Sequence, residues 1–226
     1  MKRYLRLVWA ITAKDLRVEW RTRERFATMA AFVVLTAFLF NYAIDHGVIH
    51  PRDIASALIW MTLLLGGLLG LGRTFELEKD EGAIEGLLVA PVPRDALFLG
   101  KVVSNAVLVG TIVVLTVFTV AFFFQVDLTR NPGWLALHLG MGTLGFVSLG
   151  TLFSGITAGT RIGTTLLPVL LFPLLVPVVT FGANGTSQIL QGFPAAGVHG
   201  NLRILSAFTL VALTAGVLLF RYIVEE

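Results

Sequence analysis

Six long apolar stretches alternate with short polar ones along the chain. They cover residues 26–44, 54–72, 102–126, 133–159, 162–182 and 204–220, and only Thr160 and Arg161 separate the fourth from the fifth. Each is close in length to the roughly 20-residue helix that crosses the hydrocarbon core of a bilayer. In lipid, a single segment satisfies its own backbone hydrogen bonds only as a helix. The pattern therefore predicts six transmembrane helices.

The composition supports a membrane protein and excludes several other classes. Hydrophobic residues make up 56% of the 226 residues and charged residues only 14%, whereas a soluble domain carries about 25% charged residues. The chain has no cysteine, which excludes disulfides and thiolate metal sites. We expect one all-α integral membrane domain over residues 1–226.

The basic residues are distributed unevenly between the two sides of the predicted bundle. With a cytoplasmic N-terminus, fourteen of the 17 Lys and Arg residues lie on the cytoplasmic side. The other three lie outside: Arg52, Arg130 and Arg203. Because cytoplasmic loops carry the excess of Lys and Arg, we expect both termini in the cytoplasm of a multi-pass protein.

Residues 1–25 carry an amphipathic pattern at helical spacing. Apolar side chains, two of them tryptophans, fall in one narrow stripe: Leu5, Trp9, Leu16 and Trp20. Basic side chains form a second stripe: Arg3, Arg6, Lys14, Arg17 and Arg21. This pattern predicts an interfacial helix, with Trp9, Trp20, Arg17 and Arg21 at the headgroup layer. The alternative is a basic cluster that only sets orientation.

Residues 73–101, between the second and third spans, form an acidic loop. Five carboxylates fall within ten residues: Glu76, Glu78, Asp80, Glu81 and Glu85. On a helix, Glu78, Glu81 and Glu85 share one face. The cytoplasmic membrane surface is negatively charged and does not bind an acidic helix face. The pattern therefore suits a protein partner with a basic groove. A solvated helix without a partner is the alternative.

The sequence lacks the motifs expected of an ion-coupled transporter, an ATPase or a hydrolase. No Asp, Glu, Lys or Arg lies in the centre of a predicted span, although ion-coupled carriers normally need such groups at membrane depth. The chain has no GxxxxGK[ST] phosphate loop, no HExxH and no GxSxG. We therefore expect a non-enzymatic membrane subunit that draws energy from another chain.

Small residues and prolines indicate how the spans pack. Gly66 and Gly70 form one GxxxG pair, and Gly155 and Gly159 another, a spacing that lets helices approach closely. The fifth span carries three prolines, which indicate either a hinge or an ordinary membrane helix, since prolines are common in such helices: Pro168, Pro173 and Pro177. The polar outer segment 183–201 is either a short broken or re-entrant helix or an ordinary loop.

The segment FELEKDEGAIE, residues 75–85, resembles the FExDxxDGxLE signature of the heme exporter protein B family. Four positions match it outright: Phe75, Glu76, Gly82 and Glu85. Three carry close replacements: Glu78 and Glu81 for Asp, and Ile84 for Leu. Residues 14–26 and 86–101 are also similar, so the resemblance covers essentially the whole chain.

This resemblance implies the permease subunit of an ABC transporter for cytochrome c maturation in the bacterial inner membrane. Residues 73–101 would be the coupling loop, with Phe75 in an apolar pocket of a cytoplasmic ATPase and the glutamates paired with its basic residues. ATP would bind to that ATPase, and no cofactor is expected on this chain itself. The implied partners are a second permease copy, a heme-handling integral membrane protein, a small single-span subunit and a periplasmic heme chaperone. ATP hydrolysis would drive heme export or release of the heme-loaded chaperone.

Histidines are the candidate heme contacts, and two other functions stay open. His46 and His50 fall in the first outer loop and His138 just inside the fourth span, and a histidine can ligate heme iron. Histidines at such positions more often belong to ordinary polar outer loops, which is the favoured alternative. The alternative functions are a six-helix ABC permease that exports a lipid-linked glycan or drug, and a membrane scaffold that transports nothing.

Overall fold

The computed structural model describes residues 2–44, 51–75, 93–158 and 163–223. Within these residues all regular structure is helical. In chain order the helices are α1 Lys2–Thr22, α2 Glu24–Ala43, α3 Pro51–Leu71, α6 Arg94–Phe124, α7 Pro132–Ala158, α8 Gly163–Leu190 and α9 Ala195–Ile223.

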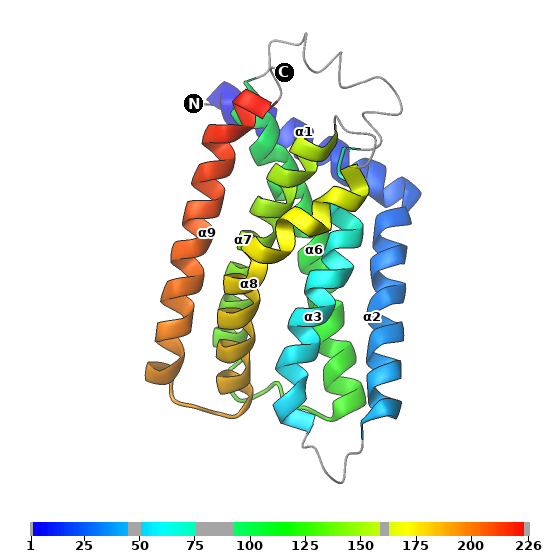
Figure 1. Ribbon diagram of the computed structural model, residues 1–226, viewed down its shortest axis with the longest axis vertical. Helices are drawn as coiled ribbons and strands as arrows, with labels where there is room; N and C mark the ends of the chain where they lie inside the picture. The colour runs from blue at the N-terminus through cyan, green and yellow to red at the C-terminus, as the bar shows by residue number, and fades with distance from the viewer. Residues whose placement is uncertain (1, 45–50, 76–92, 159–162, 224–226) are drawn as a thin grey trace.

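Every helix except α1 is long and apolar enough to cross a membrane, which gives six spans. They stand side by side, and α1 lies across one end of the bundle (Figure 1). The prediction of an all-α integral membrane protein with six spans is confirmed, and the helix predicted within residues 1–25 is present as α1. We refer below to the end that carries α1 as the α1 end.

Three spans extend by at least two helical turns beyond the predicted apolar stretches. Helix α6 begins at Arg94, inside the predicted acidic loop, while α8 continues to Leu190 and α9 already begins at Ala195. The segment 183–201 is therefore neither a re-entrant helix nor a long loop. Only residues 191–194 separate the two helices, and Gly192 supplies the positive φ of 81° that this turn requires.

The spans differ in how much of their surface the rest of the bundle covers. Helices α3 and α7 are mostly buried, and α7 packs against α6, α8 and α9. Helices α2, α8 and α9 leave most of their surface uncovered, as expected of helices that face lipid. The GxxxG pair Gly66 and Gly70 faces Phe32 and Met29 of α2, so this motif packs two helices of the same chain.

The three prolines lie inside α8, which remains one helix across them. Figure 1 shows its yellow N-terminal part inclined to its gold C-terminal part. Each proline removes a backbone donor and crowds the preceding turn, which accounts for a bend of this kind. That the bend works as a hinge stays a prediction.

Candidate functional site

The acidic loop meets the bundle at the α1 end. Its motif residues Glu76, Glu78, Glu81, Gly82 and Glu85 lie outside the described residues. Its two ends are described, with Phe75 after α3 and Arg94 at the start of α6. The side chains around these ends form the candidate site.

Lys101 of α6 joins the first end of the loop to α1. The residue is only 2% exposed, and its Nζ lies 3.2 Å from Oδ2 of Asp15. The same Nζ donates to the carbonyl oxygen of Thr74 at 3.2 Å and lies 5.0 Å from the ring centroid of Phe75. Asp15 also accepts a hydrogen bond from Ser104 at 3.2 Å. Because a buried ammonium without a partner is very costly, this arrangement binds the loop end and α1 to one point.

A second group of buried polar side chains centres on Asn105, about one helical turn after Lys101 in α6. Arg25 of α2 donates to Oδ1 of Asn105 at 2.7 Å and to the carbonyl oxygen of Gly70 at 2.9 Å. The amide nitrogen of Asn105 donates to Thr151 of α7 at 3.0 Å and to the Thr74 hydroxyl at 3.3 Å. Polar groups within a membrane bundle are expected to pair with one another in this way. Thr74 is therefore held from two sides, by Lys101 and by Asn105.

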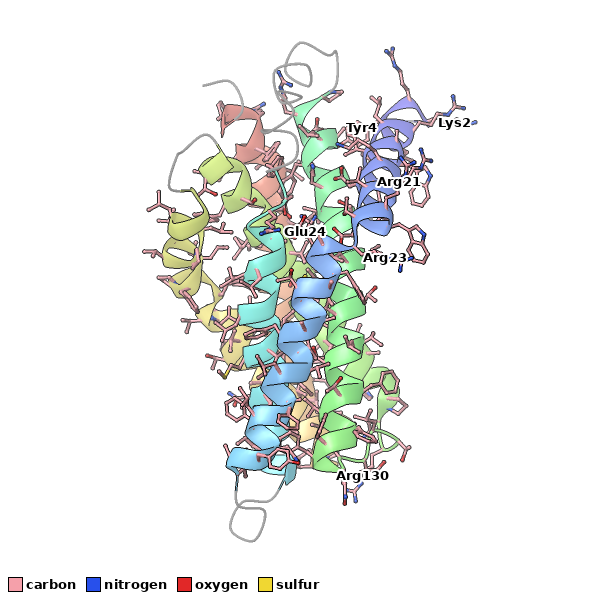
Figure 2. The ribbon with its side chains drawn as sticks, turned by 90° about the vertical axis from the view of Figure 1, so that its right-hand side faces the viewer. Lys2, Tyr4, Arg21, Arg23, Glu24 and Arg130 are labelled. Atoms are coloured by element: carbon pink, nitrogen blue, oxygen red, sulfur yellow. The ribbon has the colours of Figure 1, made fainter. Side chains whose placement is uncertain are left out.

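Helix α1 is fastened along the first turns of α6. The Thr12 hydroxyl donates to the carbonyl oxygen of Gly100 at 3.1 Å, and a Cβ at Gly100 would come within 2.7 Å of Ile11. The Tyr4 hydroxyl donates to Oδ2 of Asp95 at 2.9 Å. Burial, together with the carboxylate of Asp95, raises the pKa of Tyr4 to about 12. Figure 2 shows Tyr4 on the side of α1 that faces α6, with Lys2 on the opposite side.

Phe75 is buried in its own bundle in this structure, and its role at an ATPase stays a prediction. The resemblance implied that its ring enters a pocket on an ATPase, but the side chain is only 7% exposed and lies inside its own bundle. It stacks on Phe220 of α9 at 6.1 Å between ring centroids. A motif match specifies the residue type but not the direction of the side chain. In this arrangement Phe75 connects the loop to α9.

The predicted membrane-interface residues of α1 point away from the bundle. Trp9 is 67% exposed and Trp20 76%, and Arg17 and Arg21 are also exposed. In the part of the chain that the structure describes, the tryptophan face is left uncovered, as a helix in the headgroup layer requires. The role of these four residues at a membrane surface stays a prediction.

His138 is a buried residue of α7. It is fully enclosed, its Nε2 lies 3.1 Å from the carbonyl oxygen of Phe181, and Gly185 of α8 packs directly against the ring. Its Nδ1 has no hydrogen-bond partner within the described part of the chain. A heme could not reach this ring without separating α7 from α8. His46 and His50 lie outside the described residues.

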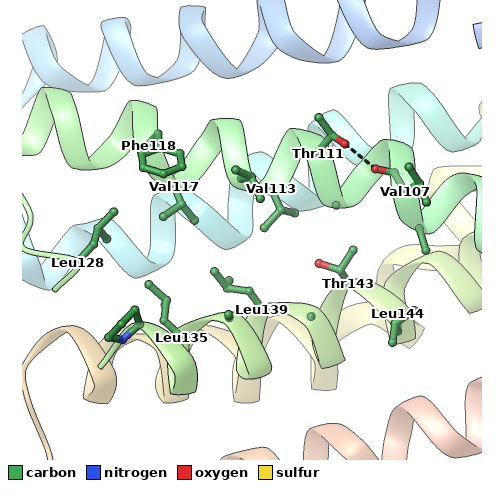
Figure 3. A pocket seen from close by; sticks show the side chains of 16 residues that line it. Val107, Thr111, Val113, Val117, Phe118, Leu128, Leu135, Leu139, Thr143 and Leu144 are labelled. Carbon is green, nitrogen blue, oxygen red and sulfur yellow. Dashed lines mark hydrogen bonds between the residues drawn. The ribbon is translucent and has the colours of Figure 1, made fainter. Parts of the chain in front are cut away.

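An apolar groove of about 810 Å³ runs between α6 and α7 (Figure 3). Val113, Val117, Leu135 and Leu139 contribute to its walls, and none of its lining residues is charged. In the residues that the structure describes, no three His, Cys, Asp or Glu side chains are grouped to hold a metal ion. The groove therefore offers mainly apolar contact, with Thr111 and Thr143 among its lining residues.

Comparison with known proteins agrees with the sequence motif. The profile of the CcmB protein family matches residues 6–222. Heme exporter protein B of Rhodobacter capsulatus is 33% identical over 201 residues, which cover 88% of this chain and 90% of the relative. The Escherichia coli K12 protein of the same name is 32% identical over 202 residues, covering 89% and 90%. That of Paracoccus denitrificans is 30% identical over 204 residues, covering 90% and 92%. With the motif, the six spans and these matches in agreement, the chain belongs to the CcmB family, that of heme exporter protein B.

Proposed function

We propose that this protein is the membrane subunit of an ABC transporter for cytochrome c maturation. In this role it couples ATP hydrolysis on a separate subunit to heme export or to release of a heme-loaded chaperone. Membership of the CcmB family supports the assignment to heme export for cytochrome c maturation. The absence of a phosphate-loop motif from the sequence supports an ATPase on a separate chain. The observation that carries the coupling role is the contact of Lys101 with both Thr74 and Phe75.

The anchored first end of the acidic loop supports a role in transmitting movement. A loop with flexible ends would absorb a displacement imposed by a partner, because its own backbone would rearrange. Here Thr74 is bound by Lys101 and Asn105, and Phe75 packs on Phe220. A displacement of the loop therefore passes into α6 and α9, and through Asp15 into α1.

We place the α1 end on the cytoplasmic side of a bacterial inner membrane. The excess of Lys and Arg at this end supports that orientation, which puts both termini and the acidic loop where an ATPase is found. The resemblance adds further partners: a second permease copy, a heme-handling integral membrane protein, a small single-span subunit and a periplasmic heme chaperone.

Conformational coupling explains the site better than a heme channel does. The buried polar side chains at the α1 end bond to one another across helices, so they do not line an open path. His138 is enclosed between α7 and α8. Movement of the acidic loop would rearrange the spans, and this rearrangement would act on the heme-handling partners.

Charge reversal in the loop tests the proposal. The variant carries three reversals: Glu78→Lys, Glu81→Lys and Glu85→Lys. We expect it to insert into the membrane but to lose co-purification of the ATPase, because like charges then face the basic groove of the partner. The matched control changes charge equally elsewhere: Asp127→Lys, Glu225→Lys and Glu226→Lys. Retention of the ATPase by the loop variant would refute docking through this surface.

A further inference from the structure

Helix α1 presents three different surfaces around its axis. One faces α6 and carries the bonded side chains of Tyr4, Thr12 and Asp15. The next carries Trp9 and Trp20 together with Leu5, which is 59% exposed. The third carries exposed basic side chains: Lys2, Arg3, Arg6, Lys14, Arg17 and Arg21.

Both carboxylates of α1 are turned inward and occupied. The side chain of Asp15 is 12% exposed and paired with Lys101. That of Glu19 is 13% exposed; it accepts a hydrogen bond from the backbone N–H of Phe26 at 2.9 Å and lies 3.9 Å from Arg25. The exposed side of α1 therefore carries cations and no carboxylate. A basic helix that only needed solubility would gain from interspersed acidic residues.

The turn into α2 sets the level of this surface relative to the bilayer. Arg23 adopts the left-handed conformation between α1 and α2, with a φ of 54°. The apolar span α2 begins at the next residue, Glu24, so α1 lies where the chain enters the hydrocarbon. The Arg23 guanidinium lies over the Trp20 ring at 5.5 Å. Tryptophan and arginine together are typical of the headgroup layer.

We infer that the exposed surface of α1 binds anionic phospholipid headgroups and that this binding holds α1 against α6. Charge complementarity favours anionic over zwitterionic lipid, since the exposed charges are all positive. The tryptophans favour a bilayer over a soluble acidic protein, because their rings need an apolar boundary to enter. The inference does not depend on the proposed function, since it concerns lipid and this chain alone.

The effect can be estimated residue by residue. Each Lys or Arg near an anionic membrane surface strengthens binding roughly five-fold. Removing the charges of Arg17 and Arg21 should therefore lower the preference for anionic over zwitterionic lipid roughly 25-fold. Added salt should weaken the preference, because it screens exposed charges.

The test uses the full-length chain in mixed micelles. Brominated phosphatidylglycerol and brominated phosphatidylcholine are compared as quenchers of tryptophan fluorescence. We expect the native chain to prefer phosphatidylglycerol, and Arg17→Gln with Arg21→Gln to lose most of that preference. Arg17→Lys with Arg21→Lys should keep it. The matched control is Arg130→Gln with Arg203→Gln at the opposite end, which should also keep it.

A second measurement separates lipid binding from misfolding. Phosphatidylglycerol should raise the unfolding temperature of the native chain and of the control, but not that of the Arg17→Gln and Arg21→Gln variant. Arg17 and Arg21 are exposed, so this variant should fold as the native chain does in phosphatidylcholine. Three results would each overturn the inference: no lipid preference in the native chain, an unchanged preference in the glutamine variant, or an equal loss in the control.

Discussion

Replacing Lys101 with methionine should destabilise the α1 end and disconnect α1 from the acidic loop. Methionine keeps the apolar stem of the side chain but removes the charge that faces Asp15, Thr74 and Phe75. Breaking a buried ion pair by removing one partner costs about 3–5 kcal/mol, because the other charge is left uncompensated. Asp15 keeps the Ser104 hydroxyl and Lys14, at 3.2 and 3.1 Å. We therefore expect a loss near the lower end, about 3 kcal/mol of unfolding free energy.

A double-mutant cycle isolates the ion pair. Lys101→Met, Asp15→Asn and the combined variant are unfolded with denaturant in mild detergent. Once both charges are gone no isolated charge remains, so the combined variant should be clearly more stable than the sum of the single losses predicts. We expect a coupling energy of about 2 kcal/mol between the two sites. Additive losses would show that Lys101 is not stabilised by Asp15 and would refute the reasoning.

Lys101→Met also separates docking from coupling. The loop glutamates are unchanged, so co-purification of the ATPase should persist while cytochrome c maturation falls. The control is Thr116→Val, which removes a buried hydroxyl whose bond to the Ile112 carbonyl at 2.8 Å lies within α6. It should leave maturation intact. Full maturation by the Lys101→Met protein would contradict transmission through this residue.

Two further predictions concern packing and pH. Gly142→Ala should cost about 1–3 kcal/mol of unfolding free energy, because the added methyl group overlaps the indole of Trp60. The control is Gly110→Ala, which should not destabilise the protein because none of the described residues lies within 4 Å of the added group. Equal losses of the two variants in denaturant unfolding would exclude the steric cause. Tyr4→Phe should cost about 1 kcal/mol at neutral pH, since it removes the hydrogen bond to Asp95. The folded-state pKa of Tyr4 is raised from 10.0 to about 12, so the contribution of its neutral hydroxyl to stability is complete below pH 10 and is lost as the pH rises through 12. The unfolding free energy of Tyr4→Phe should lack this pH dependence. Parallel losses of stability in the native protein and in Tyr4→Phe would contradict the prediction.

The spans were predictable from the sequence because a bilayer of fixed thickness demands apolar stretches of fixed length. The helix ends were not, because a helix that leaves the hydrocarbon tolerates polar residues such as Arg94 and Asp95. Lys101 was assigned to the loop because a charged residue is not expected inside a membrane helix, although the structure buries it within α6.

The acidic motif and the stripes on α1 were also readable from residue spacing. The direction of Phe75 was not, since it depends on where Phe220 packs, about 145 residues later in the chain. The bonds of Arg25 and Asn105 likewise join α2, α3, α6 and α7. Local spacing carries no information about contacts between such distant segments.

The hydrogen bond between Asn105 and Thr151 has a consequence for biogenesis. Its donor and acceptor are 46 residues apart and lie on consecutive spans, so the bond cannot form until the ribosome has delivered α7. Until then the Asn105 amide has Arg25 and Thr74 as partners from earlier in the chain, but it lacks the acceptor that Thr151 provides. A nascent chain released before residue 151 should therefore be degraded faster than one released after it, which pulse-chase labelling would measure.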